Sequence, residues 1–166
     1  MDGTDHRRRD DGRGDPAHGT GFVWDAGDHI VTNSHVIAAG RHIRVRGLAG
    51  ERVPATVAAG LPDRDIAVLR ASLHDPKPQR RRAAAQPTGI GQPVFARGNP
   101  HGRGLAMAAG VVRAMGRTVI TGPTVQLHGM VQSTLPLQPG NSGGPAAAAG
   151  ARPEGPTVLS VPIGTY

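Results

Sequence analysis

The stretch Gly140–Pro145, Gly-Asn-Ser-Gly-Gly-Pro, says most about the fold and chemistry of this chain. A serine hydroxyl is a weak nucleophile, so a catalytic serine needs an adjacent base and hydrogen-bond donors for the oxyanion. Glycines on both sides let the backbone turn tightly and direct successive N–H groups into one hollow. The loop therefore predicts a nucleophile at Ser142, with the amides of Gly140 and Ser142 as the oxyanion hole. The alternative is an ordinary flexible loop, which Gly-Ser-Gly sequences also form.

A base for this serine has to come from the eight histidines of the chain. Six of them lie in polar, glycine-rich or arginine-rich surroundings: His6, His18, His29, His42, His74 and His101. His128 lies in a strand-like stretch, which favours a structural role. His35 differs, because it lies near the end of the β-branched run 29–37, which predicts a buried strand leading into a turn. His35 is the predicted base, although a histidine in such a run is also typical of a protein core.

An acid is needed to orient the imidazole and to stabilise its protonated form. Asp65 leads directly into the apolar run 66–69, and an ionised carboxylate at the mouth of a buried strand is costly unless it is paired. Asp65 is therefore the predicted acid. Asp63 is the rival, but it lies deeper in the turn 62–65. A plain turn residue is the alternative interpretation of Asp65, because the composition of 62–65 suits a turn.

The three candidates follow the order His35, Asp65, Ser142, which is the chymotrypsin order of this triad. The surrounding sequence resembles the HtrA/Deg family of trypsin-like serine proteases. Segments 19–23, 30–37, 65–69 and 139–145 are similar to the family's Gly-Ser-Gly-Phe strand and its histidine, aspartate and serine motifs. Segment 91–100 with Gly102 is similar to its second-barrel strand and Gly-Asn-Pro loop. The resemblance covers Gly19 to Pro145, the protease domain only, and no PDZ-like segment follows it.

Short β-like runs with glycine and proline between them, and no helical period, predict an all-β fold. The expected strands lie at 22–24, 30–32, 42–46, 53–57, 66–70, 94–96, 105–115, 118–121, 125–131 and 158–163. The resemblance implies a chymotrypsin-like double β-barrel, six strands each, with the active site in the cleft between the barrels. We expect a disordered charged arm at 1–18 and a protease domain at 19–166. Its first barrel is expected at about 19–73, the linker at about 74–90 and the second barrel at about 91–166.

The composition excludes several classes of function. The chain has 166 residues and very few aromatic residues. It has no cysteine, so disulfides and thiol chemistry are excluded. Its net charge is +7, but Lys77 is the only lysine among 19 basic residues. No aromatic residues for base stacking lie between the arginines of 7–9 or 80–82. We therefore expect no nucleic-acid partner.

The cellular compartment stays open. No run of 18 apolar residues predicts a membrane span, and residues 1–16 lack the apolar centre of a signal peptide. HtrA-like proteases usually act outside the cytoplasm. Either the start of the sequence is truncated or this protein stays in the cytoplasm.

The chain departs from the family pattern at three places. Residues 134–138 replace the family's Asp-Ala-x-Ile-Asn, and His101 replaces a phenylalanine after Gly-Asn-Pro. The alanine run 146–149 replaces an aliphatic strand, and few residues follow it. The domain therefore looks truncated at both ends, and 158–161 is the one candidate for the strand that walls the specificity pocket.

The resemblance implies a serine endopeptidase that cuts unfolded or damaged proteins after small aliphatic residues, without a metal or other cofactor. Ser142 would attack, His35 would transfer the proton and Asp65 would orient His35, with an acid limb near the ordinary histidine pKa of about 6.5. Polypeptides are the expected partners. A homo-oligomer remains open, because the family's trimerising N-terminal segment is not recognisable. The alternative is a catalytically impaired, truncated homologue that binds polypeptide without cleaving it.

Overall fold

The structure is a computed structural model that describes residues 18–25, 28–38, 40, 42–76, 78, 89–121, 125–148 and 158–160. Within these ranges it contains ten β-strands, one four-residue helix and two 3-10 turns. The predicted arm, apart from residue 18, lies outside the described residues. So do residues 77 and 79–88 of the predicted linker.

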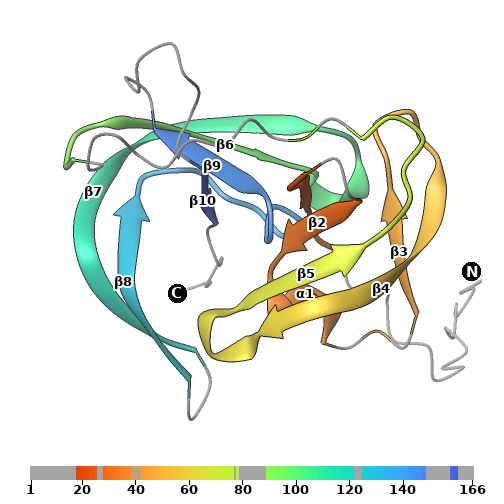
Figure 1. Ribbon diagram of the computed structural model, residues 1–166. Coiled ribbons are helices and arrows are strands. Elements are labelled where there is room, and N and C mark those ends of the chain that lie inside the picture. The colour runs from red at the N-terminus through yellow and green to blue at the C-terminus, as the bar shows by residue number, and fades with distance from the viewer. Residues whose placement is uncertain are drawn as a thin grey trace, which may run out of the picture.

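The first sheet holds five strands in the order β1-β2-β5-β4-β3, and all neighbours are antiparallel (Figure 1). They are β1 (Phe22–Val23), β2 (His29–Thr32), β3 (Ile43–Arg46), β4 (Arg52–Leu61) and β5 (Ile66–Arg70). Ile30, Leu69 and Ala71 form its buried centre, and the half-buried aliphatic side chains of β3 and β4 pack against them. β4 pairs with β3 through residues 52–55 and with β5 through residues 56–61, and its register with β5 shifts between Val57 and Ala59. Such a bulge bends the strand and curls the sheet.

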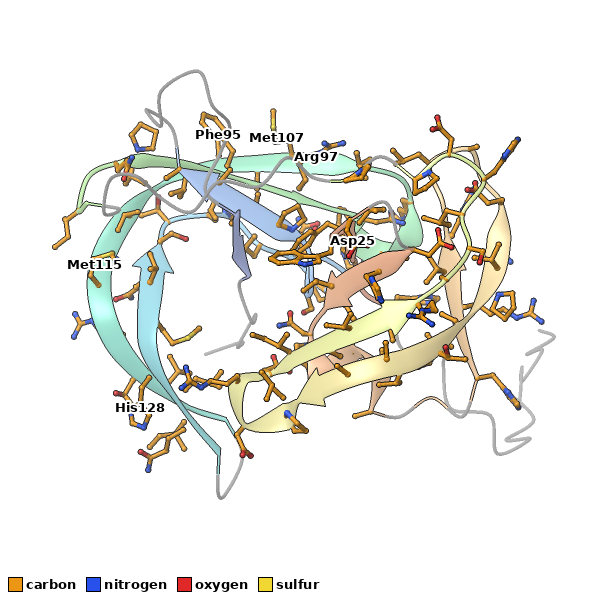
Figure 2. All side chains as sticks on the ribbon, in the orientation of Figure 1. Asp25, Phe95, Arg97, Met107, Met115 and His128 are labelled. Atoms are coloured by element: carbon orange, nitrogen blue, oxygen red, sulfur yellow. The ribbon has the colours of Figure 1, made fainter. Side chains whose placement is uncertain are left out.

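The second sheet is also antiparallel, in the order β10-β9-β6-β7-β8. Its strands are β6 (Pro93–Gly98), β7 (Ala106–Thr121), β8 (Val125–Ser133), β9 (Pro145–Ala148) and β10 (Val158–Ser160). Val94, Val112 and Ala148 form its buried centre. The alternate residues of β6 face outward, as Figure 2 shows for Phe95 and Arg97, with Met107 of β7 paired beside Arg97. Successive side chains on a strand point to opposite faces, so the buried face of β6 carries only small and aliphatic side chains.

The strand β7 is longer than the sequence predicted. Two runs, 105–115 and 118–121, were expected, but one strand covers both and curls with β8 into a long arm (Figure 1). Gly116 has φ +67° and lies where the register with β8 shifts. Glycine adopts this backbone at no steric cost, so the chain bends there without ending the strand.

Two further local expectations can be compared with the structure. The run 29–37 was expected to be a buried strand leading into a turn; β2 ends at Thr32, and the residues after it form the one-turn helix α1 (Ser34–Ile37). The alanine run 146–149 does not abolish the strand there, since β9 spans Pro145–Ala148 and pairs with both β6 and β10. Alanine fits this position because Ala146 and Ala148 are almost fully buried against their neighbours.

The all-β prediction is confirmed. Two curled sheets, one from each half of the chain, account for nearly all regular structure (Figure 1). Each sheet has five strands within the described ranges, where the resemblance implied six. Those same ranges hold no helix of the length and apolarity that a membrane crossing needs.

Candidate active site

The helix α1 carries His35 against Asp65. The carboxylate Oδ2 of Asp65 lies 2.7 Å from His35 Nδ1, and Oδ1 accepts the backbone N–H of His35 at 2.9 Å. This two-point contact fixes both the ring and the start of the helix. A carboxylate on Nδ1 favours the tautomer with its proton there, which leaves Nε2 as the basic nitrogen.

Strand register brings these two residues together. β2 and β5 are antiparallel with Thr32 opposite Ala67, so the residues after β2 lie beside those before β5. Asp65 has φ +53° and its N–H donates to the carbonyl of Pro62 at 2.9 Å, closing the turn η1 (Pro62–Arg64). Aspartate tolerates this left-handed backbone better than most residues do. The turn thereby aims the carboxylate back across the end of β2.

Asn33 supports the His35–Asp65 pair by bonding the backbone of Asp65. This role was not predicted from the sequence. Its Nδ2 donates to the carbonyl of Asp65 at 2.8 Å, and the N–H of Ser34 donates to the same carbonyl at 3.2 Å. Asn33 is 1% exposed, and its Oδ1 is buried without a partner within the described part of the chain. The signal available in the sequence was a polar amide between a buried strand and the candidate histidine.

The pKa of His35 is raised above its ordinary value of 6.5. The largest cause is the hydrogen bond to Asp65; burial of the ring lowers the pKa, and the negative charge of Asp65 raises it further. Asp65 thus makes the imidazole a stronger base than the sequence alone indicates. The protonated form of His35 therefore persists to a higher pH than its ordinary pKa of 6.5 implies.

The rival acid Asp63 and the histidines His29 and His128 make no hydrogen bond to His35 in the described residues. Asp63 is exposed in η1, and no hydrogen bond joins it to His35 in the described residues. His29, at the start of β2, forms its own pair with Asp25, with Nδ1 lying 3.0 and 3.1 Å from the two carboxylate oxygens. His128, predicted to be structural, is exposed on β8 and contacts Thr118 Oγ1 at 3.1 Å. His6 lies outside the described residues.

The serine loop takes its shape from glycine. Gly140 has φ +97° and Gly143 has φ +81°, a region that side chains disfavour. A Cβ on Gly140 would lie 2.7 Å from the carbonyl of Asn99, and one on Gly143 would clash with Thr20 O and Thr32 Oγ1. Both positions therefore require glycine for space as well as for backbone conformation.

The amides predicted to form the oxyanion hole carry no hydrogen bond. Within the described ranges, the N–H groups of Gly140 and Ser142 have no partner, while the carbonyls on either side of them do. Paired carbonyls with unpaired amides are what an anion-binding loop needs, since the N–H groups stay available to a negative oxygen.

Ser142 lies next to the histidine end of the first sheet. Its carbonyl accepts the N–H of Thr20 at 2.7 Å, and a Cβ on Gly19 would contact both that carbonyl and Val36, the residue after His35. No hydrogen bond joins Ser142 Oγ to His35 Nε2 in the part of the chain that the structure describes. Nucleophile–base contacts in free enzymes are often loose and tighten when substrate binds.

A cavity of about 170 Å³ lies behind the serine loop rather than at these three residues. It is lined by Ala96, Pro100, Ala106, Met107, Ala108, Pro136, Gln138 and Asn141. The side chain of Asn141 reaches toward Gly98, where a Cβ would clash with it. Residues of β6, β7 and the serine loop therefore line the cavity together.

Comparison with known proteins agrees with this geometry. The family described as the trypsin-like peptidase domain matches residues 19–152. The chain belongs to this family. It is 37% identical over 134 residues to Protease Do-like 1 of Arabidopsis thaliana, and 35% identical over 127 residues to a probable periplasmic DegP-like serine endoprotease of Pseudomonas fluorescens. Each match covers 76% of this chain but only 29% and 26% of those proteins, so the chain spans less than a third of their length.

Solved structures extend the likeness to three dimensions. The HtrA-type protease AlgW carrying S227A, in complex with a decapeptide, matches with a TM-score of 0.70 and 27% identity, covering 79% of this chain and 39% of that one. The MamO protease domain of Magnetospirillum magneticum matches at a TM-score of 0.70 over 87% of this chain and 83% of that one. Its 22% identity supports the fold alone. The chain is therefore an HtrA/Deg-type protease domain with the chymotrypsin-like double barrel that the sequence predicted.

Proposed function

We propose that this chain is a serine endopeptidase whose nucleophile, base and acid are Ser142, His35 and Asp65. The observation that carries the proposal is the 2.7 Å contact between Asp65 Oδ2 and His35 Nδ1, together with two serine-loop amides that have no partner among the described residues. A carboxylate–imidazole pair generates a base, and the amides offer the donors that a tetrahedral intermediate needs. The chain belongs to the trypsin-like peptidase family, and a relative named as a serine endoprotease supports the same reaction class.

The reaction divides into acylation and deacylation. Ser142 Oγ attacks the peptide carbonyl carbon while His35 Nε2 takes its proton, and the carbonyl oxygen becomes an oxyanion facing the amides of Gly140 and Ser142. The intermediate then expels the amine, which takes the proton from His35. Water, deprotonated by His35, hydrolyses the acyl-enzyme and restores Ser142. Asp65 stays ionised throughout and stabilises the imidazolium.

The substrates proposed are unfolded or damaged polypeptides, cut after small aliphatic residues. Relatives named as serine endoproteases support the reaction class. The proposed domain boundaries are those of the sequence analysis, with a first barrel at about 19–73 and a second at about 91–166. Sedimentation at two concentrations decides between a monomer and a homo-oligomer.

The test compares wild type with Ser142→Ala on unfolded casein. Loss of the nucleophile lowers the rate on the order of a millionfold in enzymes of this kind. We expect casein cleavage by wild type and none above background by Ser142→Ala. Equal rates for the two would show that Ser142 is not the nucleophile.

A second candidate function is polypeptide binding without cleavage. It is favoured by one observation, that no hydrogen bond joins Ser142 to His35 in the described residues. A fluorophosphonate probe separates the two functions, because it reacts with an activated serine and needs little of the substrate pocket. We expect labelling that disappears in both Ser142→Ala and His35→Ala. A folded protein that binds casein but does not label would support the binding function instead.

A further inference from the structure

Thr20, between β1 and the start of the described chain, makes four hydrogen bonds to three separate segments. Its Oγ1 donates to the carbonyl of Gly140 at 2.6 Å and accepts the N–H of Asn99 at 2.9 Å. Its N–H donates to the carbonyl of Ser142 at 2.7 Å, and its carbonyl accepts from Thr32 Oγ1 at 2.7 Å. One half-buried residue of the first sheet thus contacts the serine loop, the loop after β6 and the end of β2.

Separate hydrogen bonds restrain three successive peptide groups of the serine loop. In a trans peptide the N–H points away from the C=O of the same unit, so a bond to the carbonyl fixes the direction of the amide. The unit that ends in the Gly140 amide is held at the Pro139 carbonyl by the N–H of His101 at 3.0 Å. The unit that ends in the Ser142 amide is held at the Asn141 carbonyl by the N–H of Gly144 at 2.9 Å.

The unit between them is the one that Thr20 holds. Its carbonyl, on Gly140, accepts from Thr20 Oγ1, and its N–H, on Asn141, donates to the carbonyl of Gln138 at 3.0 Å. This is the only bond in the set that comes from a side chain. Glycine at 140 has no side chain to resist rotation about φ and ψ, so the bond from Thr20 supplies the restraint that the residue itself lacks.

We infer that Thr20 is a positioning residue for the oxyanion donors, acting through the Gly140 carbonyl; the inference rests on the proposed peptidase activity. Without its hydroxyl, the Gly140 carbonyl loses the donor that it has in the structure, and the Asn99 N–H loses its acceptor. The loop at residues 99–101, whose His101 N–H holds the Pro139 carbonyl, then loses its bond to Thr20 as well, so the Gly140 amide is free to turn away from the developing oxyanion. The loss falls on the transition state, because the oxyanion forms only there.

The experiment removes the hydroxyl while keeping the shape of the side chain. Thr20→Val is compared with Thr20→Ser, which keeps the hydroxyl, and with Thr118→Val, which makes the same chemical change on the β7–β8 arm. Within the described residues, Thr118 Oγ1 bonds only His128 Nδ1, at 3.1 Å, so this control loses a hydrogen bond of similar kind. kcat and KM on fluorescent casein and the rate of fluorophosphonate labelling are measured per folded molecule, with the folded fraction taken from Trp24 fluorescence.

We expect Thr20→Val to lower kcat and the labelling rate about 10- to 100-fold with KM unchanged, within the range seen when oxyanion donors are impaired. Thr20→Ser and Thr118→Val should keep wild-type values. If Thr20→Val does not fold, Thr20→Ala removes the same hydroxyl with a smaller side chain. A lower melting temperature with unchanged kcat per folded molecule would overturn the inference and leave Thr20 a purely structural residue. Wild type without Ser142-dependent labelling would instead overturn the proposed function.

Discussion

The two halves of the candidate site are built by different means. His35 and Asp65 come from one sheet, and a side chain of each makes the decisive 2.7 Å contact. The serine loop, in contrast, is held mainly by backbone groups and by Thr20, which precedes β1 of the first sheet. The acid–base half therefore depends on residue identity and strand register. The nucleophile half depends on backbone conformation, so it relies on glycine at positions 140 and 143 and on the hydroxyl of Thr20.

The largest effect that tests this comparison is expected for Asp65→Asn. The amide cannot stabilise the imidazolium and favours the wrong tautomer, so kcat should fall about 10⁴-fold. Both contributions that raise the pKa of His35 come from Asp65, while burial of the ring lowers it. The acid limb of the pH–rate profile should therefore lie above pH 6.5 in wild type and move to lower pH in the variant.

Asp63→Asn is the matched control for that experiment. Asp63 lies in the same turn, is exposed and makes no contact with His35 in the described residues. Its variant should keep the wild-type kcat and acid limb. An acid limb that does not move in Asp65→Asn would show that the contact with Asp65 does not set the basicity of His35.

The next effect concerns the conformation of the serine half. Gly143→Ala adds a methyl group at φ +81° that would clash with Thr20 O and Thr32 Oγ1, whereas Gly50→Ala adds one at φ +91° with nothing within 4 Å. Gly50→Ala should cost only the left-handed backbone, about 1–2 kcal/mol. Gly143→Ala should cost more and abolish fluorophosphonate labelling. Chemical denaturation gives both free energies of unfolding, and equal values for the two variants would contradict the packing argument.

The smallest expected effect concerns Asn33. Asn33→Ala removes the 2.8 Å bond to the Asp65 carbonyl, but it also removes a buried Oδ1 that has no partner in the described chain. The two changes act in opposite directions, so the free energy of unfolding should fall by only about 1–2 kcal/mol. kcat should fall much less than in Asp65→Asn. Urea unfolding and casein kinetics check this, and a loss of activity as large as that of Asp65→Asn would mean that Asn33 does more than support the turn.

Sequence reasoning reached the acid–base half more completely than the serine half. His35 and Asp65 could be selected because a histidine after a β-branched run and an aspartate before an apolar strand are local patterns. The antiparallel register that joins them follows from the same strands. The one-turn helix at Ser34–Ile37 was missed, because four residues carry no detectable helical period.

The supports of the serine loop could not be read from the sequence. Thr20 and Asn99 act at contacts with sequence separations of 120 and 79 residues, which no local pattern encodes. His101 acts through its backbone N–H, so its replacement of phenylalanine does not by itself remove the bond to Pro139. The alanine strand β9 was also unexpected, since alanine has low strand preference and only pairing on both sides makes a strand there.

The large sequence separation of the Thr20–Gly140 bond has a consequence for the order in which the two halves of the site form. The contact between His35 and Asp65 closes a loop of 30 residues, whereas that between Thr20 and Gly140 closes one of 120. Contacts of short separation form early, and a ribosome delivers the chain from its N-terminus. The acid–base pair can therefore assemble on a nascent chain that has no nucleophile. The serine loop acquires its shape only when the late segment returns to the first, so the proposed nucleophile and its oxyanion donors are positioned last.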